Sequence, residues 1–277
     1  MNNKHKQKRI ELINETIHVS SKGSYIVGNK EIEINSLSEY MTMETQFYSK
    51  KADVNHACLP KYDHNIKVVE EDSLYCGEKL LKEGLKVAVL NMASYSMPGG
   101  GVLKGSHAQE EEIFLRTDLW KSLYQFHDIG KQYGINKRND GSYPLNIRYG
   151  AIYTPRVTVF RYGQDKNYEF LEEPFRIDIV SVPALKNTEE GKISELGNEI
   201  MTTKIKQMLD VALLNGNDAI VLSAFGCGAY HNDPTNVAKL FANVLAEDYG
   251  TFFKNIRFAI LDNYKTNNYK VFKTIFG

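Results

Sequence analysis

A glycine triplet and a cluster of carboxylates lie close together near the middle of the chain. The triplet is Gly99–Gly101, and after a short loop Gln109, Glu110, Glu111 and Glu112 open a predicted helix. Glycine has no Cβ, so a ligand can approach its backbone amides closely. The first amides of a helix and its dipole also favour anions. The segment therefore predicts a site for a phosphate-bearing ligand with acid–base chemistry beside it.

The three glutamates cannot do the same work. Successive side chains on a helix point about 100° apart, because the helix has 3.6 residues per turn. Either Glu110 or Glu111 can face a ligand while the other braces a loop or meets substrate hydroxyls. Glu112 points farther round and is the least suited of the three to catalysis. The alternative is that the acids merely suit the helix dipole.

A second glycine-rich loop, Ser223–Pro234 (SAFGCGAYHNDP), also follows an apolar strand and precedes a helix. Gly226, Gly228 and the small Ala229 are typical of a loop whose amides bind anionic oxygens. The Gly99–Gly101 triplet has neither the spacing of a dinucleotide-binding fingerprint nor the Gly-Lys-Ser/Thr of a P-loop. Two such strand–loop–helix units suggest a diphosphate held between two loops.

Four other side chains of this loop have a structural and a functional interpretation. Phe225 and Tyr230 could stack on a base or pack against a ribose, or they could anchor the loop in the core. Cys227 and His231 are more easily explained as loop residues than as a nucleophile and a base, because no partner arrangement is visible in the sequence.

The elements that must position these loops alternate between strand and helix from about residue 65. We expect helices over 3–17, 36–51, 72–84, 109–126, 193–214, 234–246 and 268–276. We expect a hairpin over 25–34 and strands over 66–69, 86–91, 151–153, 157–160, 177–182, 219–223 and 256–261. This alternation predicts an α/β fold with a mixed, partly parallel sheet. We expect residues 1–62 to form an α-rich accessory segment packed on a catalytic domain of residues 63–277.

Composition excludes several classes of protein. The 277 residues have zero net charge, 42% hydrophobic and 25% charged residues, as in ordinary globular proteins. No overall field attracts nucleic acid, and no apolar run suggests a signal peptide or a membrane span. Cys58, Cys76 and Cys227 form neither a disulfide framework nor a zinc pattern. We therefore expect a cytoplasmic protein without a metal or another cofactor, and without a membrane or nucleic-acid partner.

The run LNMASYSMPGGG followed by VLKGSHAQEE resembles the signature of the poly(ADP-ribose) glycohydrolases. It is most similar to the microbial-type branch, whose catalytic part is a macrodomain. The segments Ile152–Arg161, Ile179–Ala184, Ser223–Pro234 and Asn255–Leu261 follow in the order expected of that branch. The opening ELINETI resembles its amino-terminal segment, so the similarity covers nearly the whole chain.

This resemblance implies a three-layer α/β/α macrodomain that binds ADP-ribose or poly(ADP-ribose), with ADP-ribosylated proteins as possible partners. It implies that Glu111 is the catalytic acid, that Glu110 holds ribose hydroxyls, and that Tyr230 packs near the adenosine or the distal ribose. The two glycine loops would surround the diphosphate. The implied substrate contacts are Asn91, Gly99, Gly100, Gly101, Val102, Gln109, Phe225, Gly226, Cys227, Gly228, Ala229 and Tyr230.

The chain departs from the branch at four positions. Met92 and Met97 stand where an aromatic residue and an asparagine are more usual, and Val102 stands where phenylalanine is usual. Glu112 adds a third acid where a smaller or neutral residue is typical. These departures leave the predicted acid and the glycines in place but put the substrate preference in doubt.

Three functions remain open on the sequence. The first is a hydrolase that releases ADP-ribose from poly(ADP-ribose). The second is a reader that binds ADP-ribose without turnover, although a reader has no need of the Gln-Glu-Glu sequence. The third is a hydrolase of another ADP-ribosyl linkage that uses the same glutamate.

Overall fold

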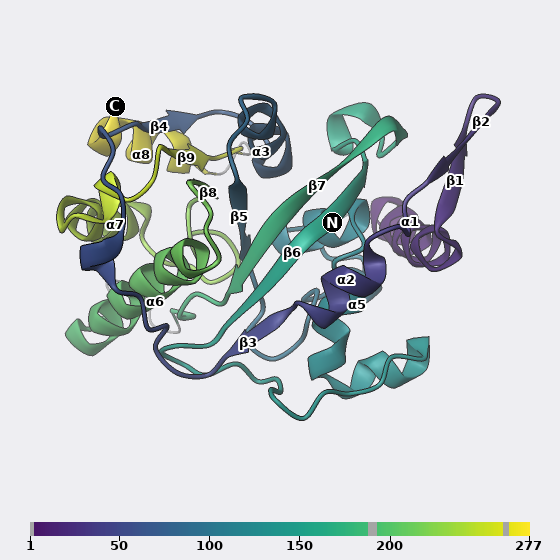
Figure 1. Cartoon of the computed structure of the whole chain (residues 1–277), viewed down its shortest axis with the longest axis horizontal. Helices are drawn as coiled ribbons and strands as arrows, with labels where there is room; N and C mark the ends of the chain where they lie inside the picture. The colour runs from purple at the N-terminus through teal and green to yellow at the C-terminus, as the bar shows by residue number, and fades with distance from the viewer. Residues whose placement is uncertain (1–2, 188–192, 263–265) are drawn as a thin grey trace. The chain divides into compact units, whose positions relative to one another are not determined.

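A computed structural model describes residues 3–187, 193–262 and 266–277 (Figure 1). The α-helices are α1 (Asn3–Lys22), α2 (Ser38–Met43), α3 (Ser73–Lys82), α4 (Gln109–Arg116), α5 (Trp120–Leu123), α6 (Glu195–Leu214), α7 (Pro234–Ala246) and α8 (Asn268–Phe276). The strands are β1 (Ser24–Val27), β2 (Lys30–Glu33), β3 (Gln46–Tyr48), β4 (Ile66–Val69), β5 (Val87–Met92), β6 (Ala151–Arg161), β7 (Phe170–Val182), β8 (Ala219–Leu222) and β9 (Asn255–Ala259).

The main sheet has seven strands in the order β3-β6-β7-β5-β8-β9-β4, and β1 pairs with β2 in a separate hairpin. The α/β class with a mixed central sheet is thus confirmed. Two compact units are distinguished by their internal contacts. The first comprises Met1–Phe47, Ala93–Pro144 and Ile152–Ile179, and the second comprises Tyr48–Met92, Leu145–Ala151 and Val180–Gly277.

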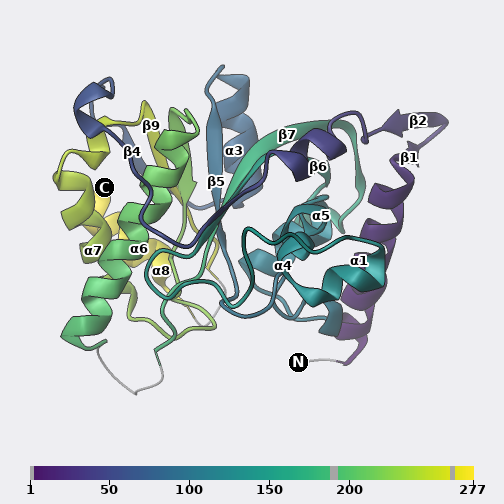
Figure 2. The ribbon, with the colours of Figure 1, turned by 60° about the horizontal axis from the view of Figure 1, so that its bottom comes forward.

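The second unit is a parallel α/β layer structure. In it β5 pairs with β8, β8 with β9 and β9 with β4, all parallel. The β4–α3–β5 connection and the β8–α7–β9 connection cross the sheet in opposite directions. Because such crossovers are right-handed, α3 and α7 cover opposite faces (Figure 2). On the α7 face, Phe258 of β9 packs against Phe241 of α7 and Phe272 of α8, with ring centroids 5.2 and 5.3 Å apart.

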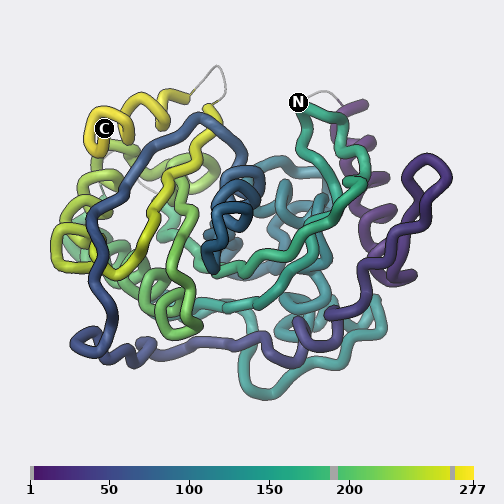
Figure 3. The backbone as a smooth tube through the Cα atoms, turned by 45° about the horizontal axis from the view of Figure 1, so that its top comes forward, coloured from purple at the N-terminus to yellow at the C-terminus, as the bar shows by residue number. Residues whose placement is uncertain are grey.

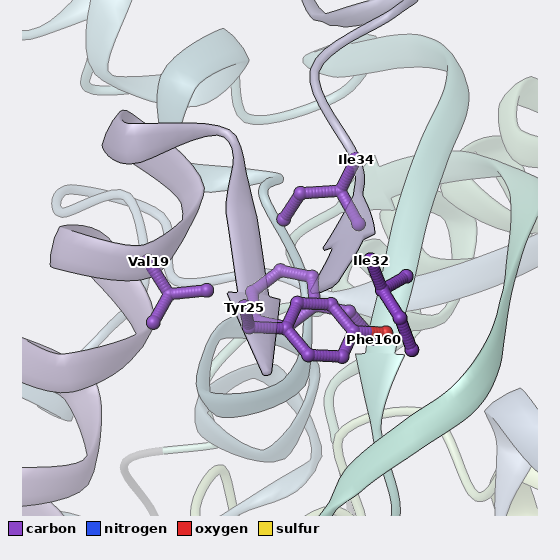
Figure 4. Close-up of a cluster of buried hydrophobic side chains, with 5 residues drawn as sticks. All are labelled: Val19, Tyr25, Ile32, Ile34 and Phe160. Atoms are coloured by element: carbon purple, nitrogen blue, oxygen red, sulfur yellow. The ribbon is translucent and has the colours of Figure 1, made fainter. Parts of the chain in front are cut away.

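The first unit has its own apolar cluster, which joins α1, the β1–β2 hairpin and β6 (Figure 4). The cluster consists of Val19, Tyr25, Ile32, Ile34 and Phe160. The helix and the hairpin that follow one another at the start of the chain can be traced in Figure 3. The predicted hairpin over 25–34 is confirmed, and α1 is one and a half turns longer than the predicted helix.

Residues 109–126 form no continuous helix, and that prediction is wrong. The helix α4 ends at Arg116, and Thr117 is extended (φ −139°, ψ 169°) and bridges to Val159 of β6. The carboxylate of Asp118 accepts the Thr158 amide at 2.8 Å. The helical spacing of apolar residues persists on both sides of this break, because a second helix, α5, begins at Trp120.

The predicted helix over 36–51 is also wrong, since only α2 is helical there. Its N-cap residue, Leu37, makes no capping hydrogen bond through its side chain. At the other end the Thr45 hydroxyl donates to the Met41 carbonyl at 2.7 Å and bonds the Ser122 hydroxyl at 3.0 Å. The chain then becomes β3, where the Phe47 ring lies 5.0 Å from the Phe126 ring.

Residues 151–161 form the single strand β6 rather than the two short strands predicted. Pro155 and Arg156 interrupt the apolar pattern in the sequence, and Arg156 has a positive φ of 53°. The strand continues through them, and the Arg156 amide donates to the Asp178 carboxylate at 2.9 Å. The strand β7 begins at Phe170, before the predicted 177. The short connection over 162–169 requires β6 and β7 to run antiparallel.

The remaining predicted elements match within a few residues, and α7 and α8 match at both ends. The Asp72 carboxylate caps α3 by accepting the Tyr75 amide at 3.0 Å. Within the described residues, no helix combines the length and the apolar character needed to cross a membrane.

Candidate active site

The loop between β5 and α4 folds back so that its amides meet the first turn of α4. Glu110 is 4% exposed, and both of its carboxylate oxygens are occupied. Oε2 accepts the Ser94 amide at 2.7 Å and Oε1 accepts the Gly99 amide at 3.0 Å. Glu110 therefore ties the two ends of the 94–99 segment to the helix.

Glu111 is also buried, at 7% exposure, but its carboxylate has different hydrogen-bond partners. Its Oε1 accepts the Gly101 amide at 2.9 Å. Its Oε2 has no hydrogen-bond partner in the part of the chain that the structure describes. One oxygen thus fixes the carboxylate, and the other remains available to a reacting group.

The amides of the glycine triplet are all used inside the protein. The Gly99 and Gly101 amides donate to Glu110 and Glu111, and the Gly100 amide donates to the Met97 carbonyl at 2.9 Å. The interpretation of these amides as an open anion-binding loop is therefore wrong for this structure. The triplet instead holds the two carboxylates, and a substrate contact by these three residues remains a prediction.

Each glycine of the triplet is needed for a separate steric reason. A Cβ on Gly99 would lie 2.5 Å from the Phe114 ring, and one on Gly101 would lie 2.2 Å from the Ser106 hydroxyl. A Cβ on Gly100 would lie 2.6 Å from Glu111 Oε1 and 3.0 Å from Glu110 Oε2. Gly99 and Gly100 also have positive φ values of 78° and 55°, which side-chain-bearing residues rarely adopt.

The other predicted residues of this segment are placed around the carboxylates. Val102 is buried, and Gln109 is the first residue of α4. Glu112 points away from the pair: its Oε1 lies 2.8 Å from His107 Nε2 and accepts the Tyr168 hydroxyl. His107 and Tyr168 are not among the residues predicted from the sequence. The close spacing of His107 and Glu112 was a usable signal, but nothing in the sequence indicates Tyr168.

In the second unit, Asn91 is fully buried near the end of β5. Its amide nitrogen donates to the Ser181 hydroxyl at 3.0 Å. Its Oδ1 has no hydrogen-bond partner among the described residues. A buried acceptor without a donor is costly, so this oxygen is a candidate for contact with a ligand hydroxyl.

The 223–234 loop of the second unit is shaped by Asn232, a residue that was not predicted from the sequence. Asn232 is 2% exposed, and its amide donates to the Leu185 carbonyl at 2.8 Å and the Gly226 carbonyl at 3.2 Å. Gly226 has a φ of 73°, and a Cβ there would lie 2.4 Å from the Asn232 amide. Asn232 therefore fixes the turn that Gly226 permits.

The predicted ligand contacts of this loop differ in exposure. Gly228 and Ala229 are exposed and Tyr230 is half-buried, so these three can meet a ligand. The Phe225 side chain is fully buried, which agrees with packing in the core. Burial, with Asp233 and Asp262 adding to it, raises the pKa of the Cys227 thiol to about 12. A thiol with that pKa is a poor nucleophile near neutral pH.

The fold is similar to that of several known structures. A structure of poly(ADP-ribose) glycohydrolase (PARG) from Thermomonospora curvata bound to the inhibitor ADP-HPD is 26% identical, with a TM-score of 0.79. The match covers 98% of this chain and 100% of that one. PARG from Deinococcus radiodurans in complex with ADP-ribose is 23% identical over 88% of this chain and 98% of its own, with a TM-score of 0.69. This second likeness shows the fold.

A family model described as the microbial-type PARG catalytic domain matches residues 13–162, more than half of the chain. The matched stretch includes the glycine triplet and the whole of α4. A search of curated proteins finds no match. The chain therefore belongs to the family of microbial-type poly(ADP-ribose) glycohydrolases.

Proposed function

We propose that this chain hydrolyses the ribose–ribose O-glycosidic bonds of poly(ADP-ribose), with Glu111 as the general acid and base. The observation that carries the assignment is that two buried carboxylates accept different numbers of hydrogen bonds. Both oxygens of Glu110 accept backbone amides, whereas only Oε1 of Glu111 does. Glu111 is therefore the glutamate with an oxygen left for substrate, and family membership supplies the substrate class.

The reaction balances with one carboxyl group and one water. Protonated Glu111 donates its proton to the departing ribose oxygen as the bond from that oxygen to the anomeric carbon breaks. The anomeric carbon then has oxocarbenium character. The Glu111 carboxylate takes a proton from water, the water oxygen bonds to the anomeric carbon, and the acid is regenerated. The Gly101 amide keeps the carboxylate in place throughout.

Glu110 supports this chemistry from the adjacent position. By tying Ser94 and Gly99 to α4, it fixes the loop that carries the Gly101 amide. We retain its predicted contact with ribose hydroxyls, because each carboxylate oxygen has a second lone pair that accepts a further hydrogen bond. We also retain Asn91, Gln109, the glycine triplet with Val102, and Phe225–Tyr230 as substrate contacts, with the exposed Gly228 and Ala229 the most accessible of them.

We further propose that ADP-ribosylated proteins are partners and that the enzyme acts in the cytoplasm without a cofactor. The three cysteines are free thiols, which suits a reducing compartment.

The test is turnover of defined poly(ADP-ribose) and of mono-ADP-ribosylated substrates by wild type and by Glu111→Gln. The amide side chain keeps an acceptor for Gly101 but cannot donate and retrieve a proton, so kcat should fall by about 10²–10⁴-fold. Binding of ADP-ribose, measured by calorimetry, should change little. Glu172→Gln is the matched control, because Glu172 is an exposed glutamate of β7 and belongs neither to the 94–101 loop nor to α4.

Each alternative gives a different result. A reader would bind ADP-ribose in both forms and hydrolyse neither substrate. A hydrolase of another linkage would release ADP-ribose from the mono-modified substrates alone, again through Glu111. Equal turnover of polymer by wild type and Glu111→Gln would refute the role of Glu111.

A further inference from the structure

The helix that carries the catalytic glutamate begins without a side-chain cap. Its N-cap residue, Ala108, has no side chain able to accept the first helical amides. In many helices the residue before the N-cap packs against the fourth helical residue, and this contact fixes the angle at which the chain enters the helix. Those two positions are occupied here by His107 and Glu112, and the contact is polar, with Nε2 and Oε1 2.8 Å apart.

A third residue closes the contact from another element. The Tyr168 hydroxyl donates to the same Glu112 oxygen that meets His107. Tyr168 has a φ of 59°, and the Arg161 guanidinium holds its carbonyl at 2.9 Å. Burial and the neighbouring Glu112 raise the pKa of the Tyr168 phenol, so it remains a donor. The strained backbone of Tyr168 thus places its hydroxyl against the Glu112 carboxylate.

The loop that leads into α4 is also anchored on α1. The Arg9 side chain donates to the Gly105 carbonyl at 2.9 Å. Gly105 has a φ of 71°, and a Cβ there would lie 2.5 Å from the Lys6 carbonyl of α1. The segment is therefore fixed at Gly105 by α1 and at His107 by Glu112. These contacts leave the segment between the triplet and α4 little freedom to change the angle at which it enters the helix.

We propose that His107 and Glu112 are positioning residues, which hold the start of α4 so that Glu111 meets the Gly101 amide. Tyr168 completes the contact by fixing the Glu112 carboxylate. This inference rests on the proposed catalytic role of Glu111. It gives a task to the third acid of the Glu110–Glu112 run, which the reaction itself leaves unused.

The test combines kinetics with an exchange measurement that needs no activity. Glu112→Ala should lower kcat on poly(ADP-ribose) by about 10-fold with KM nearly unchanged, because misplacement of a reacting group affects the chemical step. Amides of the 99–106 segment should exchange with deuterium faster than in wild type. Glu112→Gln tests loss of charge at constant shape, and Glu172→Ala is the control at an exposed site.

A rescue variant separates positioning from contact with substrate. Replacing both partners, His107→Leu with Glu112→Leu, creates an apolar contact at the same two helix positions and should recover most of the rate and the slow exchange. A rise in KM at constant kcat in Glu112→Ala, no recovery in the double variant, or unchanged exchange would overturn the proposal. If wild type failed to turn over polymer, the proposed function would fail, and the exchange data would still decide the role of Glu112.

Discussion

Among single residues, Glu110 and Glu111 show how neighbouring side chains of one type come to do different work. Their 100° separation on the helix is visible in the sequence, and it predicts that only one of them faces a ligand. Which backbone groups they meet is not visible. The Gly101 amide lies ten residues before Glu111, and its position depends on how the whole loop turns.

The same limit applied to the glycine triplet. Its lack of side chains predicted the close approach of a ligand to its backbone amides. The groups that approach are the protein's own carboxylates, the Phe114 ring and the Ser106 hydroxyl. A sequence shows that space is needed but not which atom fills it.

At this scale the structure predicts an altered titration of His107. Its hydrogen bond with Glu112 raises the pKa of the imidazole, and Glu111 acts in the same direction, whereas partial burial and Arg9 oppose the rise. The Tyr168 hydroxyl shares the Glu112 oxygen. An NMR titration of the imidazole should give a pKa above the ordinary 6.5, and Glu112→Gln should lower it.

The sign of the stability effect follows. The ion pair contributes fully below the unfolded pKa of histidine, and its contribution is lost as the pH rises through the raised folded pKa. An imidazole that titrated alike in wild type and Glu112→Gln would show that the pair is absent in solution.

Among elements, the break after α4 shows where periodicity misleads. Apolar residues recur at helical spacing across 109–126, yet Thr117 and Asp118 pair with Val159 and Thr158 of β6. These partners are some forty residues away in sequence. The helical spacing of apolar residues located both helical segments. It could not reveal the pairing of residues 117–118 with β6, because that pairing depends on the tertiary structure. In contrast, α3 and α7 were predictable because their caps, Asp72 and Asp233, are local.

Asp118 gives a test at the scale of this element. Burial raises the pKa of its carboxyl to about 6, although the Thr158 amide and Lys121 oppose the rise. The folded state therefore holds this proton more tightly than the unfolded state. Stability contributed by this group falls as the pH rises from about 4 to about 6.

Asp118→Asn keeps an oxygen for the Thr158 amide and removes the titration. The free energy of unfolding of the variant relative to wild type should therefore rise by about 3 kcal/mol between about pH 4 and about pH 7. Denaturant unfolding at several pH values measures this difference. A difference that does not vary with pH would mean that Asp118 titrates normally.

At the scale of the whole chain, the start of the sequence is built into the first compact unit. The α1 hydroxyl of Thr16 donates to the Leu115 carbonyl of α4 at 2.7 Å, and Arg161 of β6 donates to Thr16 at 3.1 Å. Val19 and Tyr25 share a core cluster with Phe160. Sequence predicted the α-rich character of residues 1–62, but these contacts join elements too far apart for a sequence pattern to show.

We therefore predict that a fragment of residues 63–277 does not fold cooperatively. It would expose Phe160 and leave the buried Arg161 guanidinium without Glu15 and Thr16. Loss of a partner of a buried charge typically costs about 3–5 kcal/mol, a large part of a domain's stability. Calorimetry and near-UV circular dichroism of the fragment and of the full chain make the comparison. A sharp thermal transition in the fragment would instead establish 1–62 as a separable accessory segment.

The crowding around the glycine triplet has a consequence for inhibition. At positions 99, 100 and 101 even a methyl group would collide with the Phe114 ring, with the two carboxylates or with the Ser106 hydroxyl. An inhibitor that took its contacts from the backbone of Gly100 would meet a surface that substitution cannot reshape without displacing Glu110 or Glu111. Resistance by mutation at the point of contact would then cost the enzyme its own activity.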